Sequence, residues 1–157
     1  MANGKIDERD RLIYDIIVDR YHEELQLTSD LDSKANNVIG FSGLLATLIA
    51  AIAVYLPKGH YPLLFVVPIV ILIVSAIEGL RAYWIKTYKA IEPKKFIGEY
   101  SNRTGTDTLQ EYTATIAGCI EKRHLVNEDK AKGIKYATGL LVLSVSLFFA
   151  IAMINWI

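Results

Sequence analysis

Small and polar side chains recur at helical spacing along one side of the apolar segment that begins at residue 38. They follow one another at intervals of four, three, four, three and four positions: Asn36, Gly40, Gly43, Thr47, Ala50 and Val54. This spacing keeps them on one helix face. Small residues let membrane helices approach closely, whereas Asn36, Ser42 and Thr47 would offer hydrogen bonds to water or ions in a pore. We leave both interpretations open; in either, this face meets protein or water, not lipid.

A single acidic residue, Glu78, lies close to an apolar segment, and Arg81 follows it by three positions. A carboxylate near hydrocarbon is costly and needs a partner or water. Arg81 is on the same helix face and supplies a partner. Two interpretations are open: an interfacial ion pair that seats the helix, or a charged pore mouth or gate formed by Glu78 and Arg81.

The last apolar segment also has a face of mostly small residues, formed by Gly139, Leu143, Ser146 and Ala150, with Asn155 near its end. Here the pattern favours helix packing.

Features that would support an enzyme or a metal site are missing from the sequence. His22, His60 and His124 are scattered, and Cys119 is the sole cysteine. There is no glycine loop for a nucleotide, no zinc-type spacing and no nucleophile–base pair. The 17 basic and 17 acidic residues cancel, which does not favour a nucleic-acid partner. We therefore expect no enzymatic activity, no cofactor and no bound metal.

Three apolar runs determine the class of the protein. They are Val38–Leu56, Tyr61–Ile77 and Tyr136–Ile157, and none contains Lys, Arg, Asp or Glu. A helix of about 20 apolar residues crosses the hydrocarbon core of a bilayer. The sequence thus predicts an all-α integral membrane protein with three transmembrane helices, organised as a membrane hairpin plus cytosolic helices.

Four segments follow from these runs. Residues 1–37 are expected to form a cytosolic amphipathic helix, residues 38–84 a transmembrane hairpin, residues 85–135 a cytosolic loop and helices, and residues 136–157 the third transmembrane helix. Residues 6–34 have helical periodicity. That helix either runs straight into the first span or breaks near Thr28–Asp30, where cap-forming residues cluster.

Local signals refine these boundaries. Pro57 and Gly59 predict a tight turn in the hairpin, and Pro68 predicts a kink in the second span. We expect that helix to continue to Ile91, before Glu92–Pro93 stops it. Asn127–Asp129 is expected to start a separate last helix.

The basic residues predict the orientation in the membrane. Residues 1–37 carry five Lys or Arg, the connection 57–60 carries only Lys58, and residues 81–135 carry 11. Lys and Arg collect in cytoplasmic loops. We therefore expect a multi-pass protein of the cell (inner or plasma) membrane, with its N-terminus in the cytoplasm and its C-terminus outside.

The entry into the first span resembles a known family. Asp32, Lys34 and Ala35 form a D-x-K-A pattern ahead of the small-residue span, and a later helix at Leu109–Cys119 precedes a final span. Between them come Asn127 and then Lys130 or Lys135. This layout, over about residues 30–157, resembles the SLATT proteins and the transmembrane effectors of Pycsar anti-phage systems. The resemblance implies a membrane effector that permeabilises the inner membrane when a nucleotide signal is made. Such effectors often carry or accompany a nucleotide-sensing domain, and none is visible in this sequence.

Two functions from different classes remain. The first is an oligomeric pore-forming or ion-channel-like membrane protein; the resemblance implies a nucleotide-triggered anti-phage role for it. The alternative is a non-conducting membrane anchor or scaffold whose cytosolic helices bind a partner. The expected partners are the lipid bilayer, further copies of the chain, and a cytosolic nucleotide signal or protein. Several copies are needed for a pore because three helices cannot enclose a water-filled path.

Overall fold

The structure is a computed structural model, and it describes residues 8–55, 62–85 and 106–156. All regular structure in these ranges is helical. The elements are α1 (Glu8–Tyr55), the short 3₁₀ helix η1 (Pro62–Phe65), α2 (Val66–Trp84) and α4 (Thr106–Trp156). Each of α1, α2 and α4 contains a stretch long and apolar enough to cross a membrane. The prediction of an all-helical chain with three such helices is therefore confirmed.

The chain divides into two compact units, which are described separately. The first unit contains residues 8–29 of α1 and 106–127 of α4. The second unit contains residues 30–55 of α1, η1, α2 with Ile85, and residues 128–156 of α4. The division of the chain into four segments, inside and outside the membrane, stays a prediction.

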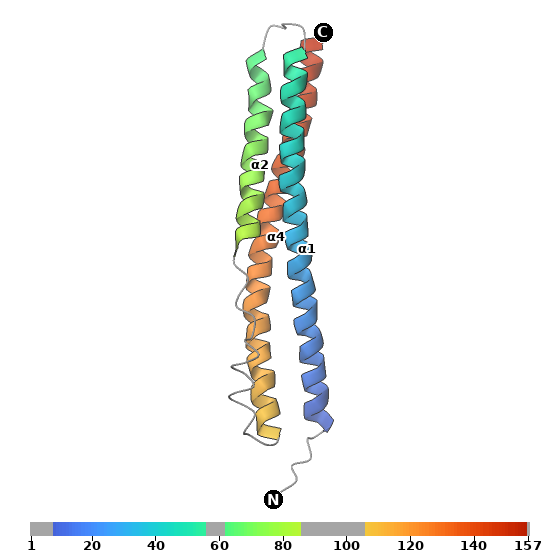
Figure 1. The fold of residues 1–157 in the computed structure, drawn as a ribbon, viewed down its shortest axis with the longest axis vertical. Coiled ribbons are helices and arrows are strands. Elements are labelled where there is room, and N and C mark those ends of the chain that lie inside the picture. The colour runs from blue at the N-terminus through green and yellow to red at the C-terminus, as the bar shows by residue number, and fades with distance from the viewer. Residues whose placement is uncertain (1–7, 56–61, 86–105, 157) are drawn as a thin grey trace, which may run out of the picture. The chain divides into compact units, whose positions relative to one another are not determined.

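In the second unit three helices pack side by side, with α2 antiparallel to α1 and α4 (Figure 1). Ser42 contacts Ser75, whereas the earlier Ala35 lies near the later Gly79, so α1 and α2 run in opposite directions. Gly133 approaches Ala82 and Ser144 bonds to Pro68, so α2 and α4 are antiparallel as well.

The buried residues of the second unit follow one another at spacings of three, four or seven along each helix. We call them the buried seam: Leu31, Ala35, Val38, Ser42 and Ile49 of α1; Pro68, Leu72, Ser75, Gly79 and Ala82 of α2; and Lys130, Ile134, Ala137, Ser144 and Ile151 of α4. Such spacing is typical of helices that pack nearly parallel to one another. Alanine, glycine and serine are frequent in the seam, so the backbones approach closely. A Cβ on Gly133 would lie 3.0 Å from that of Ala82.

In the first unit, α1 and α4 run in the same direction. Asp10 contacts Gln110, and further along both helices Glu24 contacts Asn127. The contacts include the Tyr14 and Tyr112 rings, whose centroids are 5.5 Å apart. The guanidinium carbon of the buried Arg123 lies 5.5 Å from the centroid of the Tyr21 ring. Aromatic and charged groups therefore replace the small residues found in the second unit.

The structure decides the question left open for the first helix. α1 is continuous from Glu8 to Tyr55, with no break at Thr28–Asp30. Thr28 does not cap a new helix, because its hydroxyl bonds to the Glu24 carbonyl of the preceding turn.

The prediction that Asn127–Asp129 starts a separate helix is wrong, because α4 runs unbroken from Thr106 to Trp156. Asn127 looks like a cap in the sequence. In the structure its amide instead bonds across to the Glu24 carboxylate of α1.

Two expectations for the second span also change. α2 ends at Trp84 and does not run on to Ile91, since Ile85 has a ψ of 109° and donates its N–H to the Arg81 carbonyl. Pro68 lies in the first turn of α2. An N–H there would have no intrahelical partner, so the proline does not interrupt the helix interior. The turn at Pro57 and Gly59, and residues 86–105, lie outside the described residues.

Candidate functional site

Serine side chains connect the three helices of the second unit through the buried seam. The hydroxyls of Ser42 and Ser75 are 3.2 Å apart, and Ser75 donates to the Ala137 carbonyl at 2.7 Å. Ser144 donates to the Pro68 carbonyl at 2.8 Å. A buried hydroxyl without a partner is costly, and these three are all satisfied. These hydroxyls have a structural role, because each forms a hydrogen bond between two helices.

Near the end of the seam, a buried lysine forms the closest ion pair. Lys130 is 1% exposed, and its Nζ donates to Asp32 Oδ1 at 2.6 Å. Both residues belong to the sequence pattern that carries the family resemblance, together with the buried Ala35. Sequence reasoning assigned no role to this pair. The signal in the sequence is that Lys130 lies four and seven positions before Ile134 and Ala137, on the side of α4 that is buried.

The small-residue stripe of α1 (Asn36, Gly40, Gly43, Thr47 and Ala50) is exposed along its whole length. A Cβ added to Gly40 or Gly43 would meet no atom within 4 Å. Close packing within the chain therefore uses the buried seam of α1, on a different face. Ser42, expected to offer its hydroxyl to a pore, is buried and bonded to Ser75. Thr47 is exposed, with its hydroxyl bonded to Leu44 of its own helix. The side chain of Val54 lies outside the described residues.

The rest of the outward surface of α1 has a different character. Phe41, Leu44 and Leu48 are exposed beside the stripe. At about 100° per residue they lie on a separate helix face. On α2 the exposed residues between positions 66 and 77 are all branched and apolar: Val66, Val67, Val70, Ile73, Val74 and Ile77. On α1, the exposed small and polar positions of the stripe are therefore separate from the exposed bulky ones, and α2 exposes only branched apolar residues over this range.

The expected packing face of the last span is not the one that packs within the chain. Gly139, Leu143 and Ser146 are exposed, and Ala150 is half-buried. α4 instead contacts its neighbours through Ile134, Ala137, Ser144 and Ile151, which are buried. Both faces have helical spacing, and only the three-dimensional arrangement distinguishes them. The side chain of Asn155 lies outside the described residues.

Glu78 and Arg81 do come together, as their spacing predicts. Arg81 Nη1 lies 3.8 Å from Glu78 Oε1, and their side chains are 77% and 33% exposed. They line a cleft of about 420 Å³ with Asp129, Lys132 and Tyr136. An open pair at this distance contributes little to stability, about 0–1 kcal/mol. Glu78 is partly exposed and has Arg81 as its partner, which agrees with either interpretation of the pair.

A polar network in the first unit was missed in the sequence. The Asn127 amide donates to Glu24 Oε2 at 2.8 Å, Thr28 donates to Asn127 Oδ1 at 3.0 Å, and His124 Nδ1 lies 3.1 Å from Glu24 Oε1. Asn127 is buried. A polar residue at a core position of paired helices fixes their register. The network therefore fixes how α1 and α4 align in this unit.

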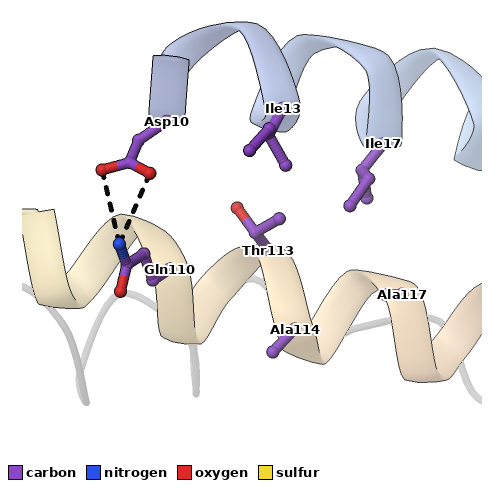
Figure 2. Close-up of a pocket in the computed structure, with 7 residues that line it drawn as sticks. All are labelled: Asp10, Ile13, Ile17, Gln110, Thr113, Ala114 and Ala117. Atoms are coloured by element: carbon purple, nitrogen blue, oxygen red, sulfur yellow. Dashed lines mark hydrogen bonds between the residues drawn. The ribbon is translucent and has the colours of Figure 1, made fainter. Parts of the chain in front are cut away.

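A shallow pocket of about 320 Å³ lies at one end of the same unit (Figure 2). The Gln110 amide bonds to both Asp10 carboxylate oxygens at 3.4 Å, while Ile13 and Ile17 face the small residues of α4. Ile13 is exposed, and so are Leu12 and Ile16. These positions belong to the apolar face of the helix predicted over residues 6–34, and they carry apolar area beyond what the pair of helices covers.

Burial is the main reason that the pKa of the Tyr112 hydroxyl lies above its usual value of about 10. The nearby Tyr14 and Tyr21 raise this pKa further. Both effects disfavour the phenolate, so Tyr112 is an uncharged packing residue.

In the described ranges, no group of three or more His, Cys, Asp or Glu side chains is arranged to hold a metal ion. The site features are thus a satisfied buried seam, an exposed small-residue stripe and an open Glu78–Arg81 pair. No protein-family profile, curated protein or solved structure matches this chain.

Proposed function

We propose that this chain is a three-span membrane protein that assembles into a homo-oligomer and conducts ions or small solutes. In this proposal residues 1–37 and 85–135 lie in the cytoplasm and the C-terminus lies outside. Copies of α1 surround the pore, and the small-residue stripe of each copy faces it. The 11 basic residues at positions 81–135 support this orientation.

The observation that carries the proposal is the exposed stripe. Asn36, Gly40, Gly43, Thr47 and Ala50 are exposed in the second unit, and a Cβ on Gly40 or Gly43 would meet no atom within 4 Å. Lipid chains gain nothing from an asparagine or a threonine, and glycine lets another backbone or a column of water approach. The bulky neighbours Phe41, Leu44 and Leu48 are suited to lipid. An exposed helix with one face for lipid and one small, polar face is suited to line the centre of an assembly.

A single copy has no path of its own through the second unit. The interior between its helices is filled by the buried seam, and the seam hydroxyls of Ser75 and Ser144 are bonded to carbonyls. A conducting path must therefore lie between copies, which is why the proposal requires an oligomer. We place Glu78 and Arg81 at its inner mouth, where a carboxylate raises the local concentration of cations.

Flux through liposomes tests the proposal. Purified protein should release a small ion or dye, and Gly43→Leu should abolish release because a bulky side chain enters the centre of the assembly. Leu48→Phe is the matched control, since it enlarges an exposed residue on the bulky face. Leu45 is a poorer control, because it is half-buried and a larger side chain there would also disturb packing within the chain. Liposomes that stay tight at every voltage and pH, with and without cytosolic nucleotides, would contradict the pore. Release that depends on a nucleotide would support the effector role that the family resemblance implies.

Orientation has its own experiment. In a Cys119→Ser background, an impermeant thiol reagent applied to intact cells should label Gly59→Cys and leave Thr106→Cys unlabelled. The opposite pattern would reverse the topology.

One observation favours the alternative function, a non-conducting anchor or scaffold. Leu12, Ile13 and Ile16 expose apolar side chains on the first unit, which is proposed to be cytosolic. Exposed apolar patches of this kind mark protein interaction sites. Two results together would favour the anchor. The liposomes would stay tight, and a partner that binds the unchanged protein would not bind Ile16→Asp.

A further inference from the structure

We propose that α4 carries a binding site for an anionic glycerophospholipid, formed by Lys132, Lys135 and Tyr136 above Gly139, Leu140 and Leu143. The site goes beyond the pore and rests on the proposed membrane insertion. These six residues line a hollow of about 610 Å³ in the second unit. Lys132 and Tyr136 also line the cleft that contains Glu78 and Arg81, whereas the other four do not.

The face is separate from the buried seam. Lys132, Tyr136, Gly139 and Leu143 follow one another at intervals of four, three and four residues, so they share one side of α4. All four are exposed or half-buried. Ile134, Ala137 and Ser144 occupy the buried side of the same helix. The face is therefore open to a ligand.

The order of side chains along α4 matches the order of groups in a phospholipid. Lys132 and Lys135 come first, with amines for a phosphate, and the exposed Tyr136 adds a hydroxyl. Measured along the helix axis from Lys135, Gly139 lies about 6 Å further on and Leu143 about 12 Å, at about 1.5 Å per residue. The lysines lie just before the apolar run that starts at Tyr136, where a headgroup would be. Each Lys or Arg near the surface of an anionic membrane adds to the attraction between the protein and that membrane.

Gly139 makes room for the acyl chain. A Cβ added to it would meet no atom within 4 Å, so close helix packing does not require glycine there. The half-buried Leu140 and the exposed Leu143 provide apolar walls. A side chain at position 139 would fill the hollow without disturbing the helices.

Acidic neighbours leave the lysines available. Lys132 Nζ lies 3.9 Å from Glu128 and 3.8 Å from Asp129, and all three side chains are more than half exposed. Such open pairs are weak. Among the described residues, no ion pair is formed by Lys135. Since the hollow itself is lined by two lysines and no carboxylate, its charge favours an anionic headgroup over a zwitterionic one.

Lipid retention measured by native mass spectrometry tests the site. Protein is released from bilayers that contain equal amounts of phosphatidylglycerol and phosphatidylcholine with the same acyl chains. We expect phosphatidylglycerol to be retained about tenfold over phosphatidylcholine, given two lysines at the surface. Lys132→Gln with Lys135→Gln should remove the preference. Gly139→Leu should lower the retention of both lipids, and Thr138→Leu, on another face, should not.

A charge control keeps the test specific. Lys34→Gln with Lys122→Gln removes the same charge from two exposed positions elsewhere and should keep the preference. Equal retention of the two lipids by the unchanged protein overturns the site, as does an equal loss in the two double variants. Glycerol phosphate that competes as well as the lipid would show that the acyl groove is not part of it.

Alkaline extraction separates this proposal from the membrane proposal on which it rests. Protein that stays in the alkaline-washed membrane but shows no lipid preference sinks the lipid site alone. Protein that is extracted without detergent sinks the membrane insertion itself.

Discussion

Small and polar residues lie on two faces of the same stretch of α1, and their surroundings differ. On the buried seam, Ala35 and Ser42 serve helix contacts within the chain, and the Ser42 hydroxyl is bonded to Ser75. On the small-residue stripe, a Cβ on Gly40 or Gly43 would meet no atom within 4 Å, and the exposed Thr47 bonds to Leu44 of its own helix. The comparison teaches that small residues mark close approach without saying to what. The seam packs within the chain, whereas the exposed stripe faces a second copy or water only in the proposed function.

The largest expected effect comes from breaking the ion pair at the end of the seam. Asp32→Ala leaves the Lys130 ammonium, 1% exposed, without its carboxylate. Removing one partner of a fully buried pair costs about 3–5 kcal/mol, and because the Asp32 side chain is 32% exposed we expect a loss near the lower end of this range. Unfolding in detergent, followed by circular dichroism, should show this loss. Asp30→Ala, at an exposed neighbouring position, is the control; equal losses would mean that the pair is not a stabilising contact.

A bulky residue in the seam should have the next largest effect. Ser75 is fully buried against Ser42 and Ala137, so Ser75→Leu overpacks the interface at a cost of about 1–3 kcal/mol. The exposed Val74 is the matched site, and Val74→Leu should change the free energy of unfolding by less than about 0.5 kcal/mol. If Ser75→Leu unfolds like the unchanged protein, the seam is misplaced.

The stripe should respond through assembly and not through folding. In a Cys119→Ser background, Thr47→Cys should crosslink between copies in membranes, because the stripe faces the centre of the proposed oligomer. Leu48→Cys, on the bulky face, should crosslink much less. Neither change should lower the unfolding free energy by more than about 0.5 kcal/mol. Stronger crosslinking at position 48 would mean that the bulky face, and not the stripe, lies at the contact between copies.

A smaller effect is expected at the open pair of α2. Glu78→Gln should lower stability by at most about 1 kcal/mol, since Arg81 is 77% exposed. If Glu78 is at a pore mouth, the same variant should reduce cation preference in the flux assay. Unchanged flux would keep the pore and exclude Glu78 from it.

The smallest effect is a pH dependence in the first unit. The pKa of Tyr112 is raised by burial, so the folded state holds its proton more tightly than the unfolded state. The stability from this difference is fully present below about pH 10 and is lost as the pH rises through the folded pKa. Tyr112→Phe should flatten the fall in stability above pH 10 in thermal melts. An unchanged slope would assign the fall to other groups.

Local composition alone predicted much of the fold. The three apolar runs lack charges, and apolar length is sufficient to identify helices that can cross a membrane. The spacing of Glu78 and Arg81 was also sufficient to bring them together, because residues three apart are neighbours on any helix. Helix ends were less predictable. Thr28 and Asn127 look like caps, but their side chains bond to Glu24, and both helices continue through them.

What the sequence by itself determined is the helical class, the three apolar stretches and the contacts that depend on one helix alone. What only the tertiary structure decided is which face of each helix is inside. Gly43 and Ala35 on α1, or Gly139 and Ala137 on α4, are equally small, and helical periodicity fits both faces. The choice depends on contacts between helices far apart in the chain, such as Ser75 with Ala137 and Lys130 with Asp32. A pattern along one helix holds no information about the partner across from it.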